Sequence, residues 1–300
     1  MKKLLYTALS LLLATAVFVN CQKDGVFNPK QKISKIHRAH SGGKRLIEEW
    51  TWEGNQLSRI SYFKNDTTVR DKVYYFYEKK QLVKMENTLD FSYIVITYNG
   101  SLYDKIDYYT CFDRKAQTFT FTHDKKKVSK IVHTTYANPQ KSMESIADNV
   151  LLASFIPQIV LEEMDKKIQK STSQKANEDV IVTHTLTYDK DNLKEWKISY
   201  NVGDKLIESV FAFESYDESK NPYYYSNPLG TDDDNFFIAL YKNNPVKIIE
   251  NRYINNVVGN EPITYDYFYR CNDKKFPTEI IKKSTYMTYS NSDTLYYEYK

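Results

Sequence analysis

Histidine and aspartate are the residues with which this sequence could build a metal or hydrolytic site. His37 and His40 lie close together, but their polar stretch offers no acidic partner; His123 and His184 fall in strand-like patterns and are interpreted as structural. Residues 232–235, Asp-Asp-Asp-Asn, could offer oxygens to Ca²⁺ but lack the alternating ligands and glycine of an EF-hand loop. Nucleophile-elbow, zinc-protease and phosphate-loop motifs are absent from the sequence. We expect no metal, no cofactor and no catalytic residue, although a hydrolase with a carboxylate pair drawn from distant strands stays open.

Three consecutive tyrosines, Tyr223, Tyr224 and Tyr225, are the best candidates for contact with a ligand. The segment reads Asn221-Pro-Tyr-Tyr-Tyr-Ser-Asn-Pro228, and its prolines discourage a continuous strand. Exposed tyrosines provide contact area at low entropic cost in protein and carbohydrate recognition. The alternative interpretation is a loop that folds Tyr223 and Tyr225 onto a sheet.

The N-terminus carries a secretion signal, because Lys2-Lys3 precedes a short apolar run at residues 4–19 and polar sequence follows at once. Two cleavage sites compete. Ala14-Thr15-Ala16 satisfies the small-residue rule and would release a soluble protein. Phe18-Val19-Asn20-Cys21 resembles a bacterial lipobox, in which the cysteine is lipidated and becomes the new N-terminus. We favour lipidation at Cys21.

Lipidation would make residues 1–20 the signal peptide, 21–32 a tether and 33–300 a single domain. Cys111 and Cys271 would then remain in an oxidising compartment, where a disulfide is one possibility. The repeat register described below places the two cysteines toward opposite ends of their hairpins, whereas bridged Cα atoms lie within ~7 Å. Two free thiols are therefore the favoured interpretation.

A nine-residue pattern that recurs six times specifies the scaffold for these residues. It consists of an aromatic residue (once His), four polar or turn residues, an apolar residue, two polar residues and a second apolar residue. The first four aromatic anchors lie 25, 21 and 25 residues apart, and such self-similarity marks a repeat architecture. The copies are Trp52-Leu57-Ile60, Tyr77-Leu82-Met85, Tyr98-Tyr103-Ile106, His123-Val128-Ile131, Tyr188-Leu193-Trp196 and Tyr241-Val246-Ile249.

Each copy is predicted to be a β-hairpin whose anchor faces the first apolar residue across a two-residue turn. Gly and Asn at the turn centres tolerate the positive φ that such turns require, whereas the Lys-Lys copies fit that geometry less well. The central pairs are Gly54-Asn55, Lys79-Lys80, Gly100-Ser101, Lys125-Lys126, Lys190-Asp191 and Asn243-Asn244.

The fold class that follows is all-β: an antiparallel meander of hairpins forming a soluble barrel or a strongly curved sheet. Composition agrees, with 27 Tyr and 15 Phe but only eight Gly and eight Pro in 300 residues. Polar strand positions carry Lys and Glu without a continuous apolar band, which argues against a membrane-embedded porin. One helical insertion, kinked at Pro157, is expected near residues 142–170, where apolar residues recur at steps of one to five residues, mostly three to five.

The hairpin units resemble YD/RHS-type repeats, as in Glu53-Gly-Asn-Gln-Leu-Ser-Arg-Ile60 and Asp189-Lys-Asp-Asn-Leu-Lys-Glu-Trp196. With the lipobox, and with Tyr216-Asp-Glu-Ser-Lys-Asn-Pro-Tyr223 ahead of Asn243-Asn-Pro-Val-Lys247, the chain resembles uncharacterised Bacteroidota lipoproteins with a porin-like β fold. That resemblance covers about residues 33–300 and implies a curved antiparallel sheet or soluble barrel, with no activity attached.

Expectations about the cellular location and modification of the protein follow from the same resemblance. Gln22-Lys23-Asp24 resembles the signal that sends such lipoproteins to the outer face of the outer membrane. The periplasmic face or secretion are the alternatives. Thr67 and Thr294 match a short O-glycosylation motif of the same bacteria.

The functional expectation is a non-catalytic surface lipoprotein, a monomer that binds a glycan or a protein. The alternatives are a structural or assembly component of the envelope and the unrecognised hydrolase. Nucleic acid is not an expected partner, because the formal charge of +4 falls to about +2 when Lys2 and Lys3 are cleaved away.

Overall fold

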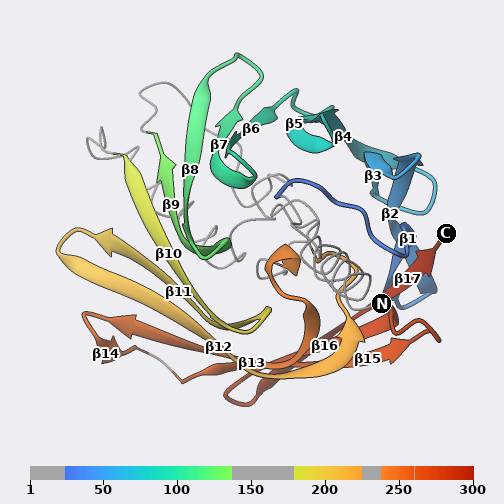
Figure 1. The fold of residues 1–300 in the computed structure, drawn as a ribbon. Coiled ribbons are helices and arrows are strands. Elements are labelled where there is room, and N and C mark those ends of the chain that lie inside the picture. The colour runs from blue at the N-terminus through green and yellow to red at the C-terminus, as the bar shows by residue number, and fades with distance from the viewer. Residues whose placement is uncertain (1–23, 137–178, 225–237, 260) are drawn as a thin grey trace, which may run out of the picture.

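The fold is a closed antiparallel β-barrel, seen along its axis in Figure 1. The computed structural model describes residues 24–136, 179–224, 238–259 and 261–300. The predicted helical insertion and residues 232–235 lie outside this part of the chain. The strands are β1 (Ile33–His40), β2 (Gly43–Glu53), β3 (Gln56–Phe63), β4 (Val69–Glu78), β5 (Gln81–Asn87), β6 (Tyr93–Asn99), β7 (Leu102–Tyr109), β8 (Lys115–Asp124), β9 (Lys127–Thr135), β10 (Val180–Asp189), β11 (Asn192–Val202), β12 (Lys205–Lys220), β13 (Asn243–Ile254), β14 (Val257–Val258), β15 (Ile263–Cys271), β16 (Pro277–Tyr286) and β17 (Tyr289–Tyr299), with a short 3₁₀ helix η2 (Ile238–Leu240) before β13.

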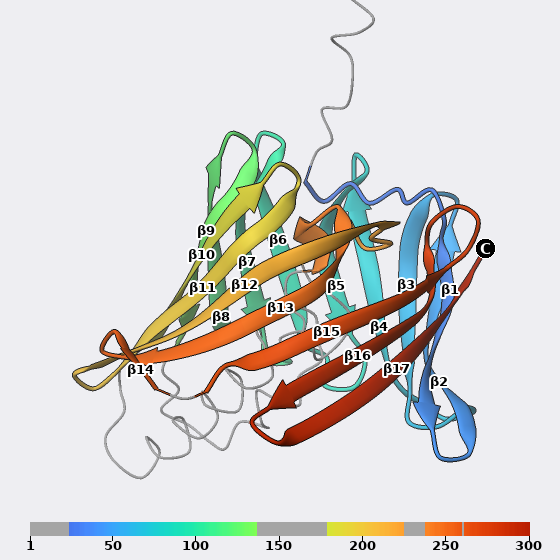
Figure 2. The same ribbon diagram turned by 90° about the horizontal axis from the view of Figure 1, so that it is seen from below.

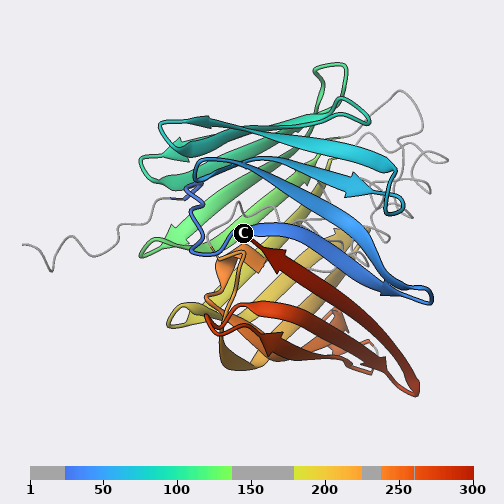
Figure 3. The same cartoon turned by 90° about the vertical axis from the view of Figure 1, so that its right-hand side faces the viewer.

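Closure of the barrel depends on two pairings between strands distant in sequence. β1 pairs with both β2 and β17, and Figure 3 shows the first and last strands side by side. β9 pairs with β10 across a connection of more than 40 residues. All other pairings join consecutive strands, except that β13 also pairs with β15 past the two-residue strand β14, so the meander closes on itself as sixteen strands. The sequence left barrel and open sheet undecided, and the barrel is what forms.

The two ends of the barrel differ in their connections (Figure 2). The turn end carries the tight turns at residues 54–55, 79–80, 100–101, 125–126 and 190–191. The loop end carries the other set of connections, which includes residues 64–68, 88–92, 110–114 and 287–288. The N-terminal segment from Asp24 onward runs across the turn end.

The predicted hairpins form in five of the six copies, and each anchor pairs directly with the first apolar residue. Both central residues of the two Lys-Lys turns have positive φ, as type I′ geometry requires: 47° and 74° at Lys79 and Lys80, 51° and 91° at Lys125 and Lys126. Lysine therefore occupies a backbone geometry that the sequence patterns associate with Gly and Asn.

A β-bulge explains the odd spacing inside the repeat. Residues three apart in a regular strand point to opposite faces, yet Leu57 and Ile60 are both buried. On the second strand of each hairpin, one extra residue follows the first apolar position, and the pairing register shifts by one there. The second apolar residue therefore points to the same face as the first. The extra residues are Ser58, Val83, Asp104, Ser129 and Lys194.

Tyrosine anchors also join their hairpins to the preceding ones. Tyr98 donates its hydroxyl hydrogen to the Leu82 carbonyl, and Tyr188 donates to the Val128 carbonyl at 2.9 Å. Tyr216 continues the series with a bond to the Leu193 carbonyl at 2.7 Å. Each aromatic residue thus caps the first apolar residue of its neighbour, which explains why an aromatic with a donor recurs at this position.

The sixth copy is not a hairpin, and that prediction is wrong. Asn243 and Asn244 begin strand β13, which pairs with β12 across the long connection of residues 221–242. Asn243 donates its backbone N–H to Asn192 Oδ1 at 3.0 Å, so these amides fasten the segment to the fifth hairpin. Asn is favoured both in turns and in local side-chain bonds to backbone, and the nonapeptide pattern does not separate the two.

The barrel interior is apolar toward the turn end and polar beyond it. Fully buried Trp196, Phe211 and Ile106 belong to the apolar core, whereas Glu48, Asp71, Gln117 and Glu250 are buried polar groups. The outer face is charged: Lys197 pairs with Glu208 at 2.7 Å, and Asp107 contacts both Lys105 and Lys115. In the described part of the chain, helices with the length and apolarity needed to cross a membrane are absent.

Two buried histidines predict that the protein loses stability on mild acidification. Burial lowers the pKa of His184 to about 3 and holds that of His133 well below its usual range. In the unfolded chain both titrate near pH 6.5, so below that value only the unfolded state gains their protons and folding weakens as pH falls. Between pH 6.5 and 5 we expect a loss of about 2 kcal/mol per histidine.

Urea unfolding at pH 7 and pH 5 tests this expectation. The His184→Gln variant should lose about half of the pH dependence attributed to the pair. His37→Gln is the comparison variant, since that ring lies on the outer face against Glu298 and the substitution leaves the buried pair, with the pH dependence attributed to it, in place. An unaltered pH slope in His184→Gln would contradict the assignment.

Candidate functional site

A pocket opens at the turn end between the β8–β9 and β10–β11 hairpins. The space between its walls is about 510 Å³ when the open solvent at its mouth is counted. Apolar groups from Val128, Ala239 and Leu240 form part of its wall. The other lining residues are Asp24, Gly25, Tyr103, Lys126, Lys127, Tyr188, Asp191 and Tyr224.

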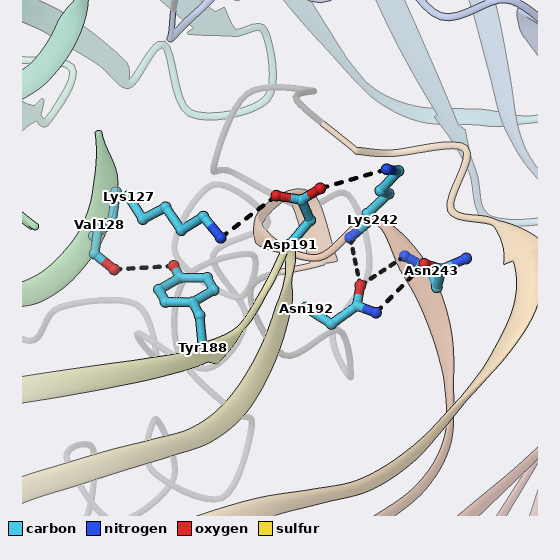
Figure 4. Close-up of polar contacts among 7 residues, drawn as sticks. All are labelled: Lys127, Val128, Tyr188, Asp191, Asn192, Lys242 and Asn243. Atoms are coloured by element: carbon cyan, nitrogen blue, oxygen red, sulfur yellow. Dashed lines mark hydrogen bonds and ion pairs between the residues drawn. The ribbon is translucent and has the colours of Figure 1, made fainter. Parts of the chain in front are cut away.

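Asp191 occupies the second position of the fifth hairpin turn, where it faces two lysines (Figure 4). Its carboxylate oxygens lie 3.4 Å from Lys127 Nζ and 3.4 Å from Lys242 Nζ. The Lys242 backbone N–H donates to Asn192 Oδ1 at 3.0 Å and also to the Asp191 carbonyl. These bonds hold the segment before β13 against the hairpin, so the carboxylate stands at a fixed position with spare acceptor capacity.

Tyr188 holds the opposite wall in place. Its hydroxyl is committed to the Val128 carbonyl, and Lys127 Nζ lies 5.2 Å from the centre of its ring. Lys127 therefore contacts both an aromatic face and the Asp191 carboxylate, which restrains a flexible side chain at the pocket edge.

The inner wall is formed where the N-terminal segment meets the third hairpin. Tyr103 donates its backbone N–H to Asp24 Oδ2 at 2.9 Å. Gly25 has φ of 72°, and a Cβ there would lie 1.9 Å from the Tyr98 hydroxyl, so only glycine fits. The Tyr103 hydroxyl is buried beside the Gly25 backbone. Burial holds its pKa well above the usual range, so it remains a neutral donor.

The pocket thus combines an apolar wall with a small set of fixed polar groups. Lys127 can donate, and Asp191 can accept. Such an arrangement suits a compact polar molecule that also has an apolar face.

Of the three candidate tyrosines, Tyr224 is the one that lines the pocket. Tyr223 is 1% exposed, lies edge-on to Trp50, and has its hydroxyl 3.0 Å from that of Tyr297. Its role in this structure is core packing. Tyr225 lies outside the described residues.

The remaining predicted residues are spread over the barrel. Thr67 is exposed in the 64–68 loop, and Thr294 is half-buried within β17. Cys111 and Cys271 are free thiols at the loop end and the turn end, so the prediction of unpaired cysteines is confirmed. Cys21 lies outside the described residues.

Histidines and acidic residues do not gather into a metal site in the described ranges. The sequence analysis found no acidic partner for His37, but in the structure Glu298 lies 3.0 Å from it on the adjacent last strand. His123, at a repeat anchor, lies 3.4 Å from Asp24 and substitutes for the tyrosines elsewhere in the series.

The segment assigned to a tether is packed against the barrel from Asp24 onward. Asp24 N–H donates to the Ser101 carbonyl and Leu82 N–H donates to the Gly25 carbonyl, each at 2.9 Å. Phe27 is buried against Trp52, with ring centres 5.7 Å apart. These contacts fix the N-terminal segment over the turn end and so complete the pocket.

Comparison with known proteins gives a match to the barrel. A porin-like protein from Bacteroides uniformis has a solved structure that covers 93% of this chain and 100% of its own, with a TM-score of 0.53 and 11% sequence identity. The likeness is one of fold. No protein-family model matches the chain, and no curated protein sequence matches it.

Proposed function

We propose that the protein is a non-catalytic, lipid-anchored binding module of the bacterial cell envelope, acting as a monomer, with the turn-end pocket as its ligand site. The pocket is the observation that carries the proposal. It brings one of the candidate tyrosines, Tyr224, together with donors and an acceptor from three separate segments.

The outer face of the barrel supports a position in water and not within the bilayer. Lys197 and Glu208 pair across two neighbouring strands, and Asp107 accepts from Thr118 at 2.7 Å while contacting two lysines. Burial alone raises the pKa of Asp107, but these donors outweigh it and lower the pKa, so the carboxylate is charged on the outer surface. Charged groups on a lipid-facing strand would be strongly destabilising. Attachment to the membrane would therefore come from a lipid on Cys21.

A saccharide is the ligand class that best fits the pocket. Sugar rings present hydroxyl groups around a face of C–H bonds, which matches the polar groups of Asp191 and Lys127 in a pocket also lined by Tyr224 and Leu240. Two carboxylates line the pocket, but Asp24 is engaged by a backbone N–H and Asp191 by two lysines. Both are thus placed to accept hydrogen bonds, which favours binding over hydrolysis.

The test is an array of neutral and acidic saccharides probed with the full chain carrying Cys21→Ser. We expect a bound saccharide that is recovered uncleaved. Tyr224→Ala should weaken that binding by about thirtyfold, the effect of losing an aromatic anchor worth about 2 kcal/mol. Asp191→Asn keeps the side-chain shape and should weaken binding through loss of the charged acceptor.

Tyr289→Ala is the matched control, because this tyrosine is 77% exposed at the loop end. It should bind like the wild type. Equal saccharide binding by Tyr224→Ala and the wild type would contradict the assignment of the pocket as the ligand site. Cleavage of the saccharide would favour the alternative that the protein is a hydrolase.

An assembly role in the envelope is the second candidate, favoured by a different observation. Apolar side chains are exposed at several loop-end connections, and clustered exposed apolar groups often mark protein interfaces. They include Leu89, Phe91, Phe112, Val257, Val258, Met287 and Tyr289. Loss of a co-purifying envelope protein on Phe91→Ser and Phe112→Ser, with saccharide binding absent from the wild type, would favour this candidate.

A further inference from the structure

The start of the described chain is pinned to the turn end at several points. Besides the backbone bonds to Ser101 and Leu82, Gln81 Nε2 donates to the Asp24 carbonyl at 3.1 Å. Asp24 is therefore fixed beside the hairpin turns at residues 79–80 and 100–101. Two residues, Gln22 and Lys23, lie between it and Cys21, which makes three steps along the chain, and a fully extended chain spans at most about 3.6 Å per step. A lipid on Cys21 must then lie within roughly 11 Å of the turn end.

The loop end lies much farther from that lipid. Strands such as β11 have 11 residues, and at about 3.3 Å per residue they separate the two ends by roughly 30 Å. A two-residue link cannot turn the barrel over to bring the loop end to the same membrane.

Lysines with an unusual backbone conformation gather at this same end. Outside glycine, positive φ is uncommon and is found mostly at Asn, Asp and His, yet six lysines adopt it. All six lie in turn-end connections: Lys79, Lys80, Lys125, Lys126, Lys190 and Lys275. The corresponding loop-end residues in the described ranges are Phe91, Asp113, Asn255, Asn256 and Met287.

Backbone preference does not explain lysine at these tips, because Asn-Gly would suit type I′ turns better. Side-chain charge is what distinguishes lysine from those residues. Glu78, Asp124 and Asp189 precede the turns, one residue back from the tips. The outermost positions of the 79–80 and 125–126 turns are therefore both cationic, and the 190–191 turn adds Lys190 beside Asp191, which suits a surface of anionic headgroups.

We propose that the turn end is the membrane-facing surface of the barrel, with its lysines against the anionic headgroup layer and the loop end pointing away. The inference rests on the lipid anchor in the proposed function. It places the pocket beside the headgroups and the exposed apolar loop tips at the far end.

The two free cysteines report on this orientation, because Cys271 lies at the turn end and Cys111 at the loop end. Lipidated full-length protein is placed on phosphatidylcholine vesicles with about a third phosphatidylglycerol and labelled with a bulky, charged maleimide. Mass spectrometry follows each thiol, and the same thiols in Cys21→Ser protein without vesicles give the reference rates. We expect labelling of Cys271 to slow by about tenfold and that of Cys111 to stay unchanged.

The outcomes separate the orientation from the anchor. Protein that floats with the vesicles but labels equally fast at Cys271, or is protected at Cys111, overturns the orientation and leaves the anchor intact. Protein that does not float overturns both.

A charge variant tests the lysines without endangering the fold. Changing Lys79-Lys80 and Lys125-Lys126 to Asn-Gly installs the preferred type I′ residues, so the melting temperature should hold or rise. Protection of Cys271 should nevertheless fall toward the reference rate. Four exposed lysines elsewhere, Lys64, Lys130, Lys247 and Lys283, changed to Gln serve as the control and should leave protection intact. Equal protection in both variants would contradict a role for the turn-end lysines.

Discussion

The Cys21→Ser variant should be recovered almost entirely in the soluble fraction, whereas the wild type should sediment with membranes. A lipid anchor holds a protein through buried acyl chains that contribute about 0.8 kcal/mol per CH₂ group, so removal of the proposed acylation site should leave nothing of comparable strength. The charged outer face of the barrel cannot replace it. Fractionation of cells expressing each form, followed by immunoblotting, measures the distribution.

Cys111→Ser is the matched control, because this thiol is exposed at the loop end and its loss should leave the distribution unchanged. Membrane association that survives in Cys21→Ser would refute the anchor. A wild type found in the soluble fraction would instead favour cleavage after Ala16.

Trp196→Ala should destabilise the barrel by about 3–5 kcal/mol, the usual cost of truncating a fully buried Trp. The indole is inaccessible to solvent, stacks on Phe211 at 4.9 Å, and donates Nε1–H to His184 Nδ1 at 3.2 Å. The truncation removes these contacts and leaves a cavity in the apolar half of the interior. Urea unfolding monitored by circular dichroism gives the free-energy difference.

Phe112→Ala provides the comparison at an aromatic residue that is 88% exposed, and its free energy of unfolding should change by less than about 0.5 kcal/mol. A similar midpoint for Trp196→Ala and the wild type would mean that this region of the interior does not contribute to stability as described.

The repeat made most of the fold predictable, because it records contacts between residues close in sequence. An aromatic anchor and an apolar residue five positions later can meet only across a short turn, as Tyr188 and Leu193 do. Closure was not predictable, because it depends on pairings such as Ile36 with Tyr297, which no local pattern encodes. The prediction of a sixth hairpin was wrong for a related reason, because Asn243 forms a hydrogen bond with Asn192, some 50 residues away.

The site was predictable only in part. Adjacent prolines drew attention to Tyr223 and Tyr224, but the sequence could not tell which ring would enter the core. The repeat pattern places Asp191 and Lys127 in turns, and the contact between their side chains depends on how neighbouring hairpins pack. One signal was available: charged residues occupied turn positions that backbone preference would give to Gly or Asn.

Hydrogen–deuterium exchange of the Cys21→Ser protein, with and without the strongest saccharide from the array, tests the central claim most directly. The account predicts slower exchange at residues 125–128, 188–193 and 239–242, where the pocket is built, and unchanged exchange at residues 110–114 and 287–289 of the loop end. Protection confined to the loop end, or absent from all the segments around the pocket, would contradict it.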